Sequence, residues 1–405
     1  MKVCDIVQFY SALSGGVKRY IDDKARYYAT QPDIEHVLIV PSHRNAVRTE
    51  GCTRIHEVKS LPVIGSKSYR LLLSPLRIKK IIKAEQPNII EVGDPCQTAW
   101  IVQSIAKRLN IPVVAYYHSD YPRAAGRTIT KYFGKYIGLV SIQVINSYLL
   151  RLYNHMAATI EATRKGRKLL IKLGIKRVIQ VPLGTDIERF HPVEQRSGVL
   201  NDLGVGEDTK LLLYVGRMAR EKNVVPLTEM MKLFAEQDNV VLLMVGDGEQ
   251  GDLVRLAAWE NRNIIWHPYC NSPELLSVFY SAADVFVHPG TNETYGLVSL
   301  EAQACGAPVV AVKGGGVDST LQYDPDAVFA AEATPRALKN AVDEQLKRKE
   351  DFEDRHARRE RVIRYYGRDT TCGLLVDLYE VVLAEHHGAS NEPIETFQAL
   401  EPTGR

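Results

Sequence analysis

Short apolar runs alternate with helix-length amphipathic segments along the first half of the chain. The apolar runs predict strands at residues 3–10, 36–40, 89–92 and 112–117, with a further strand beginning at 144–145. The amphipathic segments predict helices at residues 17–29, 70–85, 98–109 and 159–173. Strands that alternate with helices pair in parallel, so this half predicts a doubly wound α/β sheet.

The second half repeats this alternation with more continuous apolar runs, which are typical of strands covered on both faces. Strands are predicted at residues 211–215, 240–245, 264–266, 285–288 and 308–312. Helices are predicted at residues 224–236, 250–260, 273–282 and 295–304. The fold class is therefore α/β, with two doubly wound, Rossmann-like domains. Ligands of such sheets bind beyond the carboxyl ends of the strands, so we expect the domains to face each other across a binding cleft.

A segment with two prolines and a glycine, residues 178–192, separates the two patterns. We therefore predict an N-terminal domain at residues 1–190 and a C-terminal domain at 191–368. Residues 386–405 have little apolar content and are predicted to form a disordered tail.

The charge of the chain is unevenly distributed between these halves. Apolar residues make up 45% and charged residues 24%, as in soluble globular proteins, which excludes disorder as the main state. The net charge is only +3, yet residues 1–195 contain 30 Lys and Arg against 15 Asp and Glu, a net of +15. The remainder contains 21 against 33, a net of −12. A basic half indicates an anionic partner, and no nucleic-acid-binding motif accompanies it, so we expect no nucleic acid.

The cysteines and the apolar stretches indicate a cytoplasmic protein. The six cysteines form no Cys-x-x-Cys pair, which favours free thiols in a reducing compartment. The N-terminal residues MKVCDIVQFYS are interpreted as a first strand and not as a signal peptide. The most apolar long stretch, residues 137–150, has 14 residues and includes Ser141, Gln143 and Asn146. A membrane-spanning helix needs about 20 apolar residues, so only peripheral attachment to the inner face of a membrane stays open.

Glycines and cations follow the first strand of each half, where phosphate groups are often bound. Gly15 and Gly16 lie between the first strand and a helix, whose N-terminal N–H groups favour anions. The pattern matches neither Gly-x-Gly-x-x-Gly nor a Walker A loop. In the second half, the loop GRMAREKN places Arg217 and Lys222 where they could converge on one diphosphate. A simple turn and a solvated basic loop are the structural alternatives.

Two glutamates flank the helix predicted after strand 285–288. Glu293 stands at the helix entrance and Glu301 lies about two turns further, about 80° off a shared face. The two carboxylates could therefore reach different hydroxyl groups of an extended ligand. The backbone of Tyr295, Gly296 and Leu297 offers N–H donors at the helix N-terminus. The structural alternative is a helix cap and a solvated helix face.

The segment ETYGLVSLEAQACGAPVVA, with its two glutamates, closely resembles the signature of family-four retaining glycosyltransferases of the GT-B fold. SGGVKRY, VPLGTDIERFHP, GRMAREKN, VGDGEQ and VKGGGVD also resemble segments of that family, so the resemblance covers residues 1–385. It implies that residues 369–385 form a closing helix that packs back on the N-terminal domain. It also implies transfer of a hexose from a UDP- or GDP-linked sugar to an acceptor hydroxyl, with no metal or other cofactor.

The resemblance assigns roles to the residues already singled out. Glu301 would hold the ribose, and Glu293 would contact the sugar being transferred. Arg217, Lys222 and the backbone of Tyr295, Gly296 and Leu297 would bind the diphosphate and the sugar, with Gly15 and Gly16 from the other domain. His118, which follows the strand at 112–117, matches the histidine that the family directs at the reacting centre.

Fixed cations and N–H donors would stabilise the charge that builds on the leaving diphosphate. Retention often uses a carboxylate nucleophile, and the sequence offers no compelling one. This agrees with the same-face attack proposed for the family, in which the leaving phosphate takes the acceptor proton. We therefore expect His118→Ala and Glu293→Ala each to remove most of the transfer activity.

The sequence departs from the family pattern near the expected base site. Trp266, His267, Pro268 and Tyr269 replace the usual Phe-x-Gly, and Asp318 stands where the family has Glu, so the donor base stays open. A sugar-nucleotide epimerase and a non-catalytic, membrane-associated sugar-nucleotide binder are the alternative functions.

Two basic segments with apolar residues indicate a lipid-linked or anionic acceptor, as in glycolipid or polysaccharide biosynthesis. One is residues 67–83, and the other contains Arg123, Arg127, Lys131 and Lys135. A helix face packed on its own core is the structural alternative. Glycolipid-making relatives bind membranes through the N-terminal domain, and HSDYPR resembles their acceptor-side segment.

Overall fold

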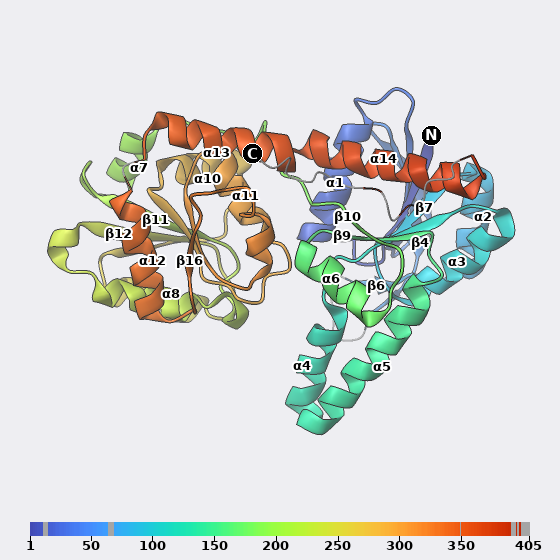
Figure 1. The fold of residues 1–405 in the computed structure, drawn as a ribbon, viewed down its shortest axis with the longest axis horizontal. Helices are drawn as coiled ribbons and strands as arrows, with labels where there is room; N and C mark the ends of the chain where they lie inside the picture. Colours follow the sequence, from blue (N-terminus) through green and yellow to red (C-terminus); the bar gives the residue numbers. More distant parts are fainter. Residues whose placement is uncertain (11–14, 64–68, 349, 390–393, 395–396, 398–405) are drawn as a thin grey trace. The chain divides into compact units, whose positions relative to one another are not determined.

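The computed structural model describes the chain apart from residues 11–14, 64–68, 349, 390–393, 395–396 and 398–405. By its internal contacts the chain divides into two compact units, unit 1 (Met1–Pro182 and Thr371–Arg405) and unit 2 (Leu183–Thr370). Each unit is a Rossmann-like α/β domain built on one large, mostly parallel sheet (Figure 1). The predicted fold class of two such domains is confirmed.

Unit 1 has an eight-stranded sheet in the order β10-β9-β8-β7-β1-β2-β4-β3, parallel except for the pair β3–β4. Its strands are β1 Lys2–Ile6, β2 Glu35–Ser42, β3 Ala46–Glu50, β4 Thr53–Lys59, β7 Ile89–Val92, β8 Val113–Tyr116, β9 Ala158–Glu161 and β10 Val178–Gln180. A separate two-stranded sheet joins β5 Leu61–Pro62 and β6 Arg70–Leu71. The helices are α1 Gly16–Tyr28, α2 Pro75–Glu85, α3 Gln97–Leu109, α4 Tyr121–Phe133, α5 Lys135–Tyr153 and α6 Arg164–Leu173.

Unit 2 has a six-stranded parallel sheet in the order β13-β12-β11-β14-β15-β16. Its strands are β11 Lys210–Val215, β12 Val240–Val245, β13 Ile264–His267, β14 Val285–His288, β15 Val309–Val312 and β16 Val328–Ala330. Its α-helices are α7 Arg196–Asp202, α8 Val224–Met230, α9 Gly251–Glu260, α10 Pro273–Ala282, α11 Leu297–Ala304, α12 Pro335–Lys347 and α13 Phe352–Tyr366. Its 3-10 turns are η1 Arg220–Lys222, η2 Met231–Leu233, η3 Glu236–Asp238 and η4 Gly316–Ser319.

The boundary between the units lies eight residues before the predicted one, at Pro182 instead of residue 190. The residues after Pro182 hydrogen-bond within unit 2. The Tyr295 hydroxyl donates to the Leu183 carbonyl at 3.0 Å, and the Thr185 N–H donates to the Tyr366 carbonyl at 2.8 Å. The chain returns to unit 1 at Thr371, within helix α14 Arg368–His386, instead of at residue 369.

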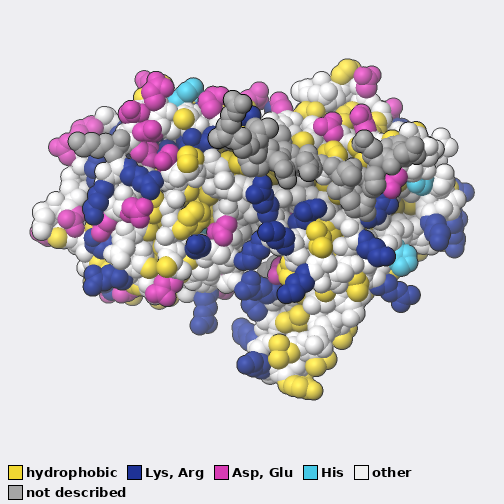
Figure 2. Space-filling model, in the orientation of Figure 1, with side chains coloured by type: hydrophobic (Ala, Val, Ile, Leu, Met, Phe, Trp, Pro, Cys, Tyr) yellow, Lys and Arg dark blue, Asp and Glu magenta, His cyan; other side chains and the backbone are white. Residues whose placement is uncertain are grey.

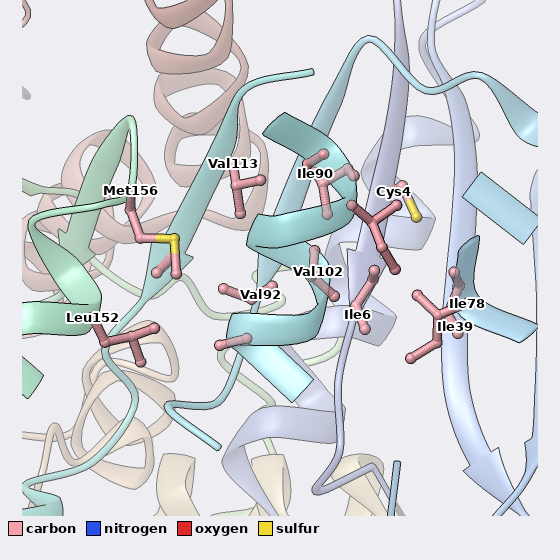
Figure 3. Packing of buried hydrophobic residues seen from close by; sticks show 14 of the residues in the cluster. Cys4, Ile6, Ile39, Ile78, Ile90, Val92, Val102, Val113, Leu152 and Met156 are labelled. Carbon is pink, nitrogen blue, oxygen red and sulfur yellow. The ribbon is translucent and has the colours of Figure 1, made fainter. Parts of the chain in front are cut away.

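The apolar strand residues form a dry layer beneath the helices of each unit. In unit 1, Ile6 of β1, Ile39 of β2 and Ile90 of β7 are fully or almost fully buried and pack with Val102 of α3 (Figure 3). Interiors packed in this way resist even small displacements. The carboxyl ends of these strands therefore have well-fixed positions.

A buried ionic cluster lies on the other side of β1, because successive side chains of a strand point to opposite faces. Lys24 Nζ of α1 lies 2.8 Å from Asp5 Oδ1, 3.2 Å from Glu91 Oε1 and 2.9 Å from the Tyr379 hydroxyl oxygen of α14. His36 Nε2 lies 2.8 Å from Asp5 Oδ2. Burial opposes ionisation of Asp5, but Lys24 and His36 lower its pKa overall, whereas burial raises the pKa of Glu91. The cluster ties the C-terminal part of α14 into unit 1.

Several sequence predictions differ from the structure. The predicted strand at residues 144–145 is wrong, because both residues lie inside α5. The predicted helix at 159–173 begins as strand β9, and the one at 70–85 begins as strand β6. Strands β3 and β4 were not predicted. β3 has few apolar residues, and β4 buries the polar side chains of Thr53 and His56, so neither segment shows the regular apolar alternation expected of a strand.

The predicted tail at 386–405 lies mostly outside the described residues. Of this stretch the structure describes residues 386–389, 394 and 397, and Ile394 is fully buried. The disordered tail therefore stays a prediction. Among the helices that the structure describes, none is both long enough and apolar enough to cross a membrane.

Candidate active site

Half of the predicted site residues lie in two loops that leave the same edge of the unit 2 sheet, namely Arg217, Lys222, Glu293, Tyr295 and Gly296. Strands β11 and β14 pair in parallel, so the loops after Val215 and His288 begin beside each other. The Asn223 side-chain amide joins the loops by donating to the Pro289 carbonyl at 2.9 Å and to Thr291 Oγ1 at 3.3 Å. The two loops therefore form one structural feature.

Lys222 and Glu293 come together at this edge. The Lys222 ammonium donates to Glu293 Oε2, and His288 Nε2 lies 3.4 Å from the same oxygen. Burial alone would raise the pKa of Glu293, but the hydrogen bond from His288 and the charge of Lys222 lower it to about 2. Glu293 is therefore ionised throughout the physiological range. His288 was not singled out from the sequence, because it is the last residue of an apolar run and was taken as part of the strand.

The backbone around Glu293 is held by the first residue of η4. The Gly316 N–H donates to the Glu293 carbonyl at 3.0 Å. A Cβ atom on Gly316 would lie only 2.5 Å from that carbonyl oxygen and 2.4 Å from the Thr294 carbonyl oxygen. Only a residue without a side chain permits this approach. The loop from Glu293 to the start of α11 is thus fixed in position.

Gly296 and Leu297 start helix α11. Gly296 is the N-cap residue with φ +91°, and Leu297 is the first helical residue. The first N–H groups of a helix have no acceptor within the helix and carry its positive dipole end, so they can hold an anion. The Tyr295 side chain is buried, and its hydroxyl donates to the Leu183 carbonyl. The role of the Tyr295 backbone in binding a ligand stays a prediction.

The other two unit 2 residues have partners of their own. Arg217 is 68% exposed, and its guanidinium donates to Glu221 Oε1 at 2.7 Å. Glu301 is only 2% exposed, and its Oε2 accepts a hydrogen bond from the Tyr280 hydroxyl of α10 at 3.0 Å. Tyr280 escaped the sequence analysis because nothing local connects α10 with α11. The structure thus brings Lys222 to Glu293 but places Arg217 and Glu301 with different neighbours.

His118 follows β8 at the carboxyl edge of the unit 1 sheet. Its ring stacks on Tyr116 with centroids 4.3 Å apart and meets the edge of Tyr20 at 5.0 Å. Its Nε2 atom is buried and has no hydrogen-bond partner among the described residues. Burial and the charge of Lys24 lower the pKa of His118 to about 3, so the ring is neutral at physiological pH. A buried polar atom without a hydrogen-bond partner destabilises the folded state. Such atoms are typical of functional sites.

Asp94 is a second unit 1 residue with an unpartnered atom, and the sequence analysis missed it. It follows β7, the strand next to β8, and a Cβ atom on the preceding Gly93 would lie 3.8 Å from His118 Cδ2. Asp94 Oδ2 accepts from the N–H groups of Gln8 at 2.6 Å and Phe9 at 3.3 Å, whereas its buried Oδ1 has no partner within the described part of the chain. Burial raises the pKa of Asp94 to about 6. An acid directly after a buried strand was the available sequence signal.

Gly15 and Gly16 lie at the start of α1, as expected. Gly15 is the N-cap residue and Gly16 the first helical residue. A Cβ atom on either glycine would meet no described atom within 4 Å. A side chain at either position would therefore meet no part of the chain that the structure describes. Among the described residues, no group of three His, Cys, Asp or Glu side chains is arranged as metal ligands.

Comparison with known families finds matches in both halves of the chain. A family described as Glycosyltransferase Family 4 matches residues 14–189. A second, described as Glycosyl transferases group 1, matches residues 199–365. The two matches together extend over most of both units.

Curated relatives and solved structures are similar over nearly the whole chain. The sulfoquinovosyl transferase of Arabidopsis thaliana is 28% identical over 92% of this chain and 72% of the relative. A GDP-mannose-dependent alpha-(1-6)-phosphatidylinositol dimannoside mannosyltransferase of Mycobacterium tuberculosis (strain ATCC 25177 / H37Ra) is 26% identical over 89% of this chain and 91% of the relative. The structure of a sucrose-phosphate synthase from Thermosynechococcus elongatus superimposes with a TM-score of 0.73 at 19% identity, covering 95% of this chain and all of that one. At that identity the likeness concerns the fold.

Proposed function

The chain belongs to the family-four glycosyltransferases of the GT-B fold, and from this membership we propose that it transfers a hexose, with retention, from a UDP- or GDP-linked sugar to an acceptor hydroxyl. The observation that carries the proposal is the Lys222–Glu293 pair at the carboxyl edge of the unit 2 sheet. In this pair, a cation that can bind a phosphate lies beside an ionised carboxylate that can bind a sugar hydroxyl. Next to them lies the N-terminus of α11.

Lys222 and Arg217 are the groups that neutralise the leaving diphosphate. In the free protein their charges are satisfied by Glu293 and Glu221. A bound diphosphate offers oxygens of higher charge, so both cations can turn from their carboxylate partners to the phosphates. The N–H groups at Gly296 and Leu297 add donors that need no reorganisation. We propose that these groups suffice without a metal, which transfer in the presence of a chelator would test.

Glu293 binds the sugar, and the reaction follows a same-face path. The bond between the anomeric carbon and the β-phosphate oxygen breaks, and the acceptor oxygen bonds to the anomeric carbon on the same face. The acceptor proton passes to the leaving phosphate oxygen. Glu293 accepts a hydrogen bond from a sugar hydroxyl, because it is ionised at any physiological pH.

In unit 1, His118 and Asp94 each provide an acceptor atom without a partner in the described structure. The neutral His118 ring can accept a hydrogen bond from the donor sugar through Nε2. Asp94 Oδ1 can accept one from a hydroxyl of the acceptor substrate. The cost of leaving these atoms unpaired in the free protein is removed when substrates bind.

Glu301 binds the ribose, and the Tyr280 hydroxyl holds its carboxylate in place. Two hydroxyl groups on neighbouring ribose carbons are suited to one carboxylate with two oxygens. We expect Glu301→Ala to weaken donor binding more than the rate of the bound complex, because the ribose lies away from the bond that breaks.

For the acceptor we propose a membrane glycolipid or another anionic, lipid-linked molecule. The names of the relatives described above support this proposal in one case, since the second includes phosphatidylinositol dimannoside. The name of the second also specifies GDP-mannose, which makes GDP-linked hexoses the first donors to test. The basic charge of residues 1–195 is consistent with such an acceptor.

A donor screen tests the proposal. The purified chain is incubated with UDP-, GDP- and ADP-linked hexoses, and release of nucleoside diphosphate is measured with and without lipid acceptors. We expect slow hydrolysis of one donor alone, strong acceleration by an acceptor, and a product with the anomeric configuration of the donor, assigned by NMR. Conversion of a donor to an epimer would instead identify an epimerase. Donor binding without turnover for every acceptor tried would indicate a non-catalytic binder.

A further inference from the structure

Helices α4 and α5 form a hairpin that projects from the body of unit 1 (Figure 1). Large hydrophobic side chains are exposed at and near its free end, among them Tyr132, Phe133, Tyr136, Ile137, Leu139 and Val144. Tyr136 is 80% exposed and Phe133 66%. Scattered exposed apolar residues are normal, but a contiguous group on a projecting element indicates an interaction surface. We call this group the hairpin tip.

The hairpin is strongly basic. Residues 121–153 contain five Lys and Arg and no Asp or Glu. Figure 2 shows hydrophobic side chains at the lower end of the hairpin, with Lys and Arg side chains along one edge above them. An apolar end with cations behind it matches the depth profile of an anionic membrane surface, where acyl chains lie beneath negative headgroups.

The two helices of the hairpin pack closely against each other. A Cβ atom on Gly126 of α4 would lie 2.5 Å from Ile142 Cγ1 of α5, and one on Gly138 would lie 1.9 Å from Thr130 Oγ1. The glycines therefore allow the two helices to approach closely. At the base, Leu149 and Leu152 are buried in the core, and the Tyr148 hydroxyl donates to the Pro95 carbonyl at 2.9 Å. The tip is consequently held out on a rigid support.

The other basic segment singled out in the sequence does not expose its apolar side chains in this way. Its apolar stripe along α2 packs inward, with Ile78, Ile81 and Ile82 buried in the core of unit 1. The structural alternative stated above, a helix face packed on its own core, therefore holds for α2. Residues 64–68 lie outside the described part of the chain.

We infer that the hairpin tip docks the protein on an anionic lipid surface, with Tyr132, Phe133 and Tyr136 among the headgroups and the lysines beside the phosphates. Aromatic side chains favour this boundary because their rings are amphipathic or apolar. A second copy of the chain fits the tip less well, because two such hairpins would bring ten cations together without one acidic residue in either hairpin. The inference rests on the proposed function only in so far as the acceptor is a membrane lipid.

Vesicle co-sedimentation of the full chain tests this inference. Vesicles of phosphatidylcholine alone are compared with vesicles in which about one third of the lipid is phosphatidylglycerol, at low and high salt. We expect binding to the anionic vesicles only, weakened by salt. The double variant Phe133→Ser with Tyr136→Ser should bind at least tenfold less, and Lys131→Gln or Lys135→Gln about fivefold less each at low salt.

Matched controls come from unit 2. Trp259→Ser removes an aromatic side chain that is 84% exposed, and Arg262→Gln removes a cation that is 83% exposed. We expect both controls to bind vesicles as the unchanged protein does. Circular dichroism and slow donor hydrolysis without vesicles should be the same for all variants, which separates failure of this inference from failure of the proposed function.

Three results would overturn the inference. The first is equal binding to neutral and anionic vesicles. The second is loss of binding no greater in the hairpin variants than in the Trp259→Ser and Arg262→Gln controls. The third is a dimer in sedimentation velocity that the double variant converts to a monomer while vesicle binding persists, because the tip would then be an interface between two copies.

Discussion

The ion pair between Lys222 and Glu293 joins the loop after β11 to the loop after β14. Both side chains are mostly buried, and His288 supports the carboxylate from the end of β14. We predict that Glu293→Gln lowers transfer at least 100-fold while the chain stays folded, because the charge that fixes a sugar hydroxyl and orients Lys222 is lost. Steady-state transfer assays with circular dichroism would measure this.

An exposed pair in the same unit is the control. Lys232 Nζ lies 2.8 Å from Glu229 Oε1, and both side chains are about half exposed. Such pairs contribute about 0–1 kcal/mol, so Glu229→Gln should leave both transfer and stability almost unchanged. Near-normal turnover by Glu293→Gln would remove Glu293 from the proposed reaction.

Local sequence patterns predicted the features of the fold that depend on neighbouring residues. Continuous apolar runs such as Val240–Val245 become strands buried on both faces, because only parallel sheets covered by helices can hide them. The same logic placed Lys222 and Glu293 beyond strand ends. Their meeting at one edge then follows from the pairing of β11 with β14.

What the sequence left out depends on contacts between distant residues. The burial of Asp94 follows from hydrogen bonds to Gln8 and Phe9, which lie more than 80 residues earlier in the chain. The partner of Glu301 is a tyrosine on another helix. The hairpin was missed because residues 137–150 are apolar on the exposed face as well, so the alternation that marks an amphipathic helix is weak. An element with apolar residues on its exposed face breaks the rule that apolar residues lie inside, so the pattern does not reveal it.

The neutral state of His118 has consequences for pH dependence. The pKa of this ring in the folded chain is about 3. We therefore predict that the pH profile of kcat/KM shows no titration of His118 near pH 6.5. His118→Gln should still lower transfer about 100-fold, since a hydrogen bond aimed at the donor sugar is disturbed. A pH–rate profile between pH 5 and 8 for both proteins would test this.

The stability of the same two proteins gives an independent readout. Below about pH 6.5 the unfolded chain takes up a proton on His118 that the folded chain refuses until about pH 3. The folded state therefore loses stability as the pH falls through this window. Between pH 7.5 and pH 5, the free energy of unfolding measured with urea should fall more for the unchanged protein than for His118→Gln. An equal loss in both proteins would contradict the neutral ring.

The hydrogen bond from Tyr280 to Glu301 predicts a separation of binding from rate. Tyr280→Phe keeps the ring packed between Phe190 and Phe286 but removes the hydroxyl that orients Glu301. We expect KM for the donor to rise about three- to tenfold with little change in kcat, because the ribose contact is made equally in the ground and transition states. Equal falls in kcat and kcat/KM would place Tyr280 nearer the reacting bond.

The ionic cluster of unit 1 predicts a large stability difference between two lysines of one helix. Lys24→Met leaves the carboxylates of Asp5 and Glu91 buried without their cation, which should cost about 3–5 kcal/mol of unfolding free energy. Lys18 is the control on α1, because its partner Asp22 is one-third exposed, so Lys18→Met should cost less than about 1 kcal/mol. Urea unfolding measures both. Should Lys24→Met fail to fold, Tyr379→Phe, which removes one hydroxyl from the cluster, gives the smaller measurable loss of about 1–3 kcal/mol.

Replacement of Asp94 by Asn should change activity and stability in opposite directions. The folded pKa of Asp94, about 6, lies above the usual value, so the folded chain holds a proton that the unfolded chain releases as the pH rises above about 4. Stability is therefore lost as the pH rises from 4 through 6, and Asp94→Asn avoids this loss. At pH 8, removal of about 1 kcal/mol of this destabilisation would raise Tm by about 2–4 °C. At pH 4 the substitution should leave Tm almost unchanged.

The same substitution should weaken the acceptor site. An amide N–H₂ in place of the unpartnered Oδ1 cannot accept a hydrogen bond from an acceptor hydroxyl, so KM for the acceptor should rise about tenfold or more while donor hydrolysis stays unchanged. Glu161→Gln is the matched control: burial raises the pKa of Glu161 to about 7, but Thr163 already donates to both of its oxygens. If Asp94→Asn and Glu161→Gln change the acceptor KM equally, Asp94 has no special role. A rise confined to Asp94→Asn, together with its pH-dependent gain in Tm, fits a carboxylate kept at a cost to stability because it binds the acceptor.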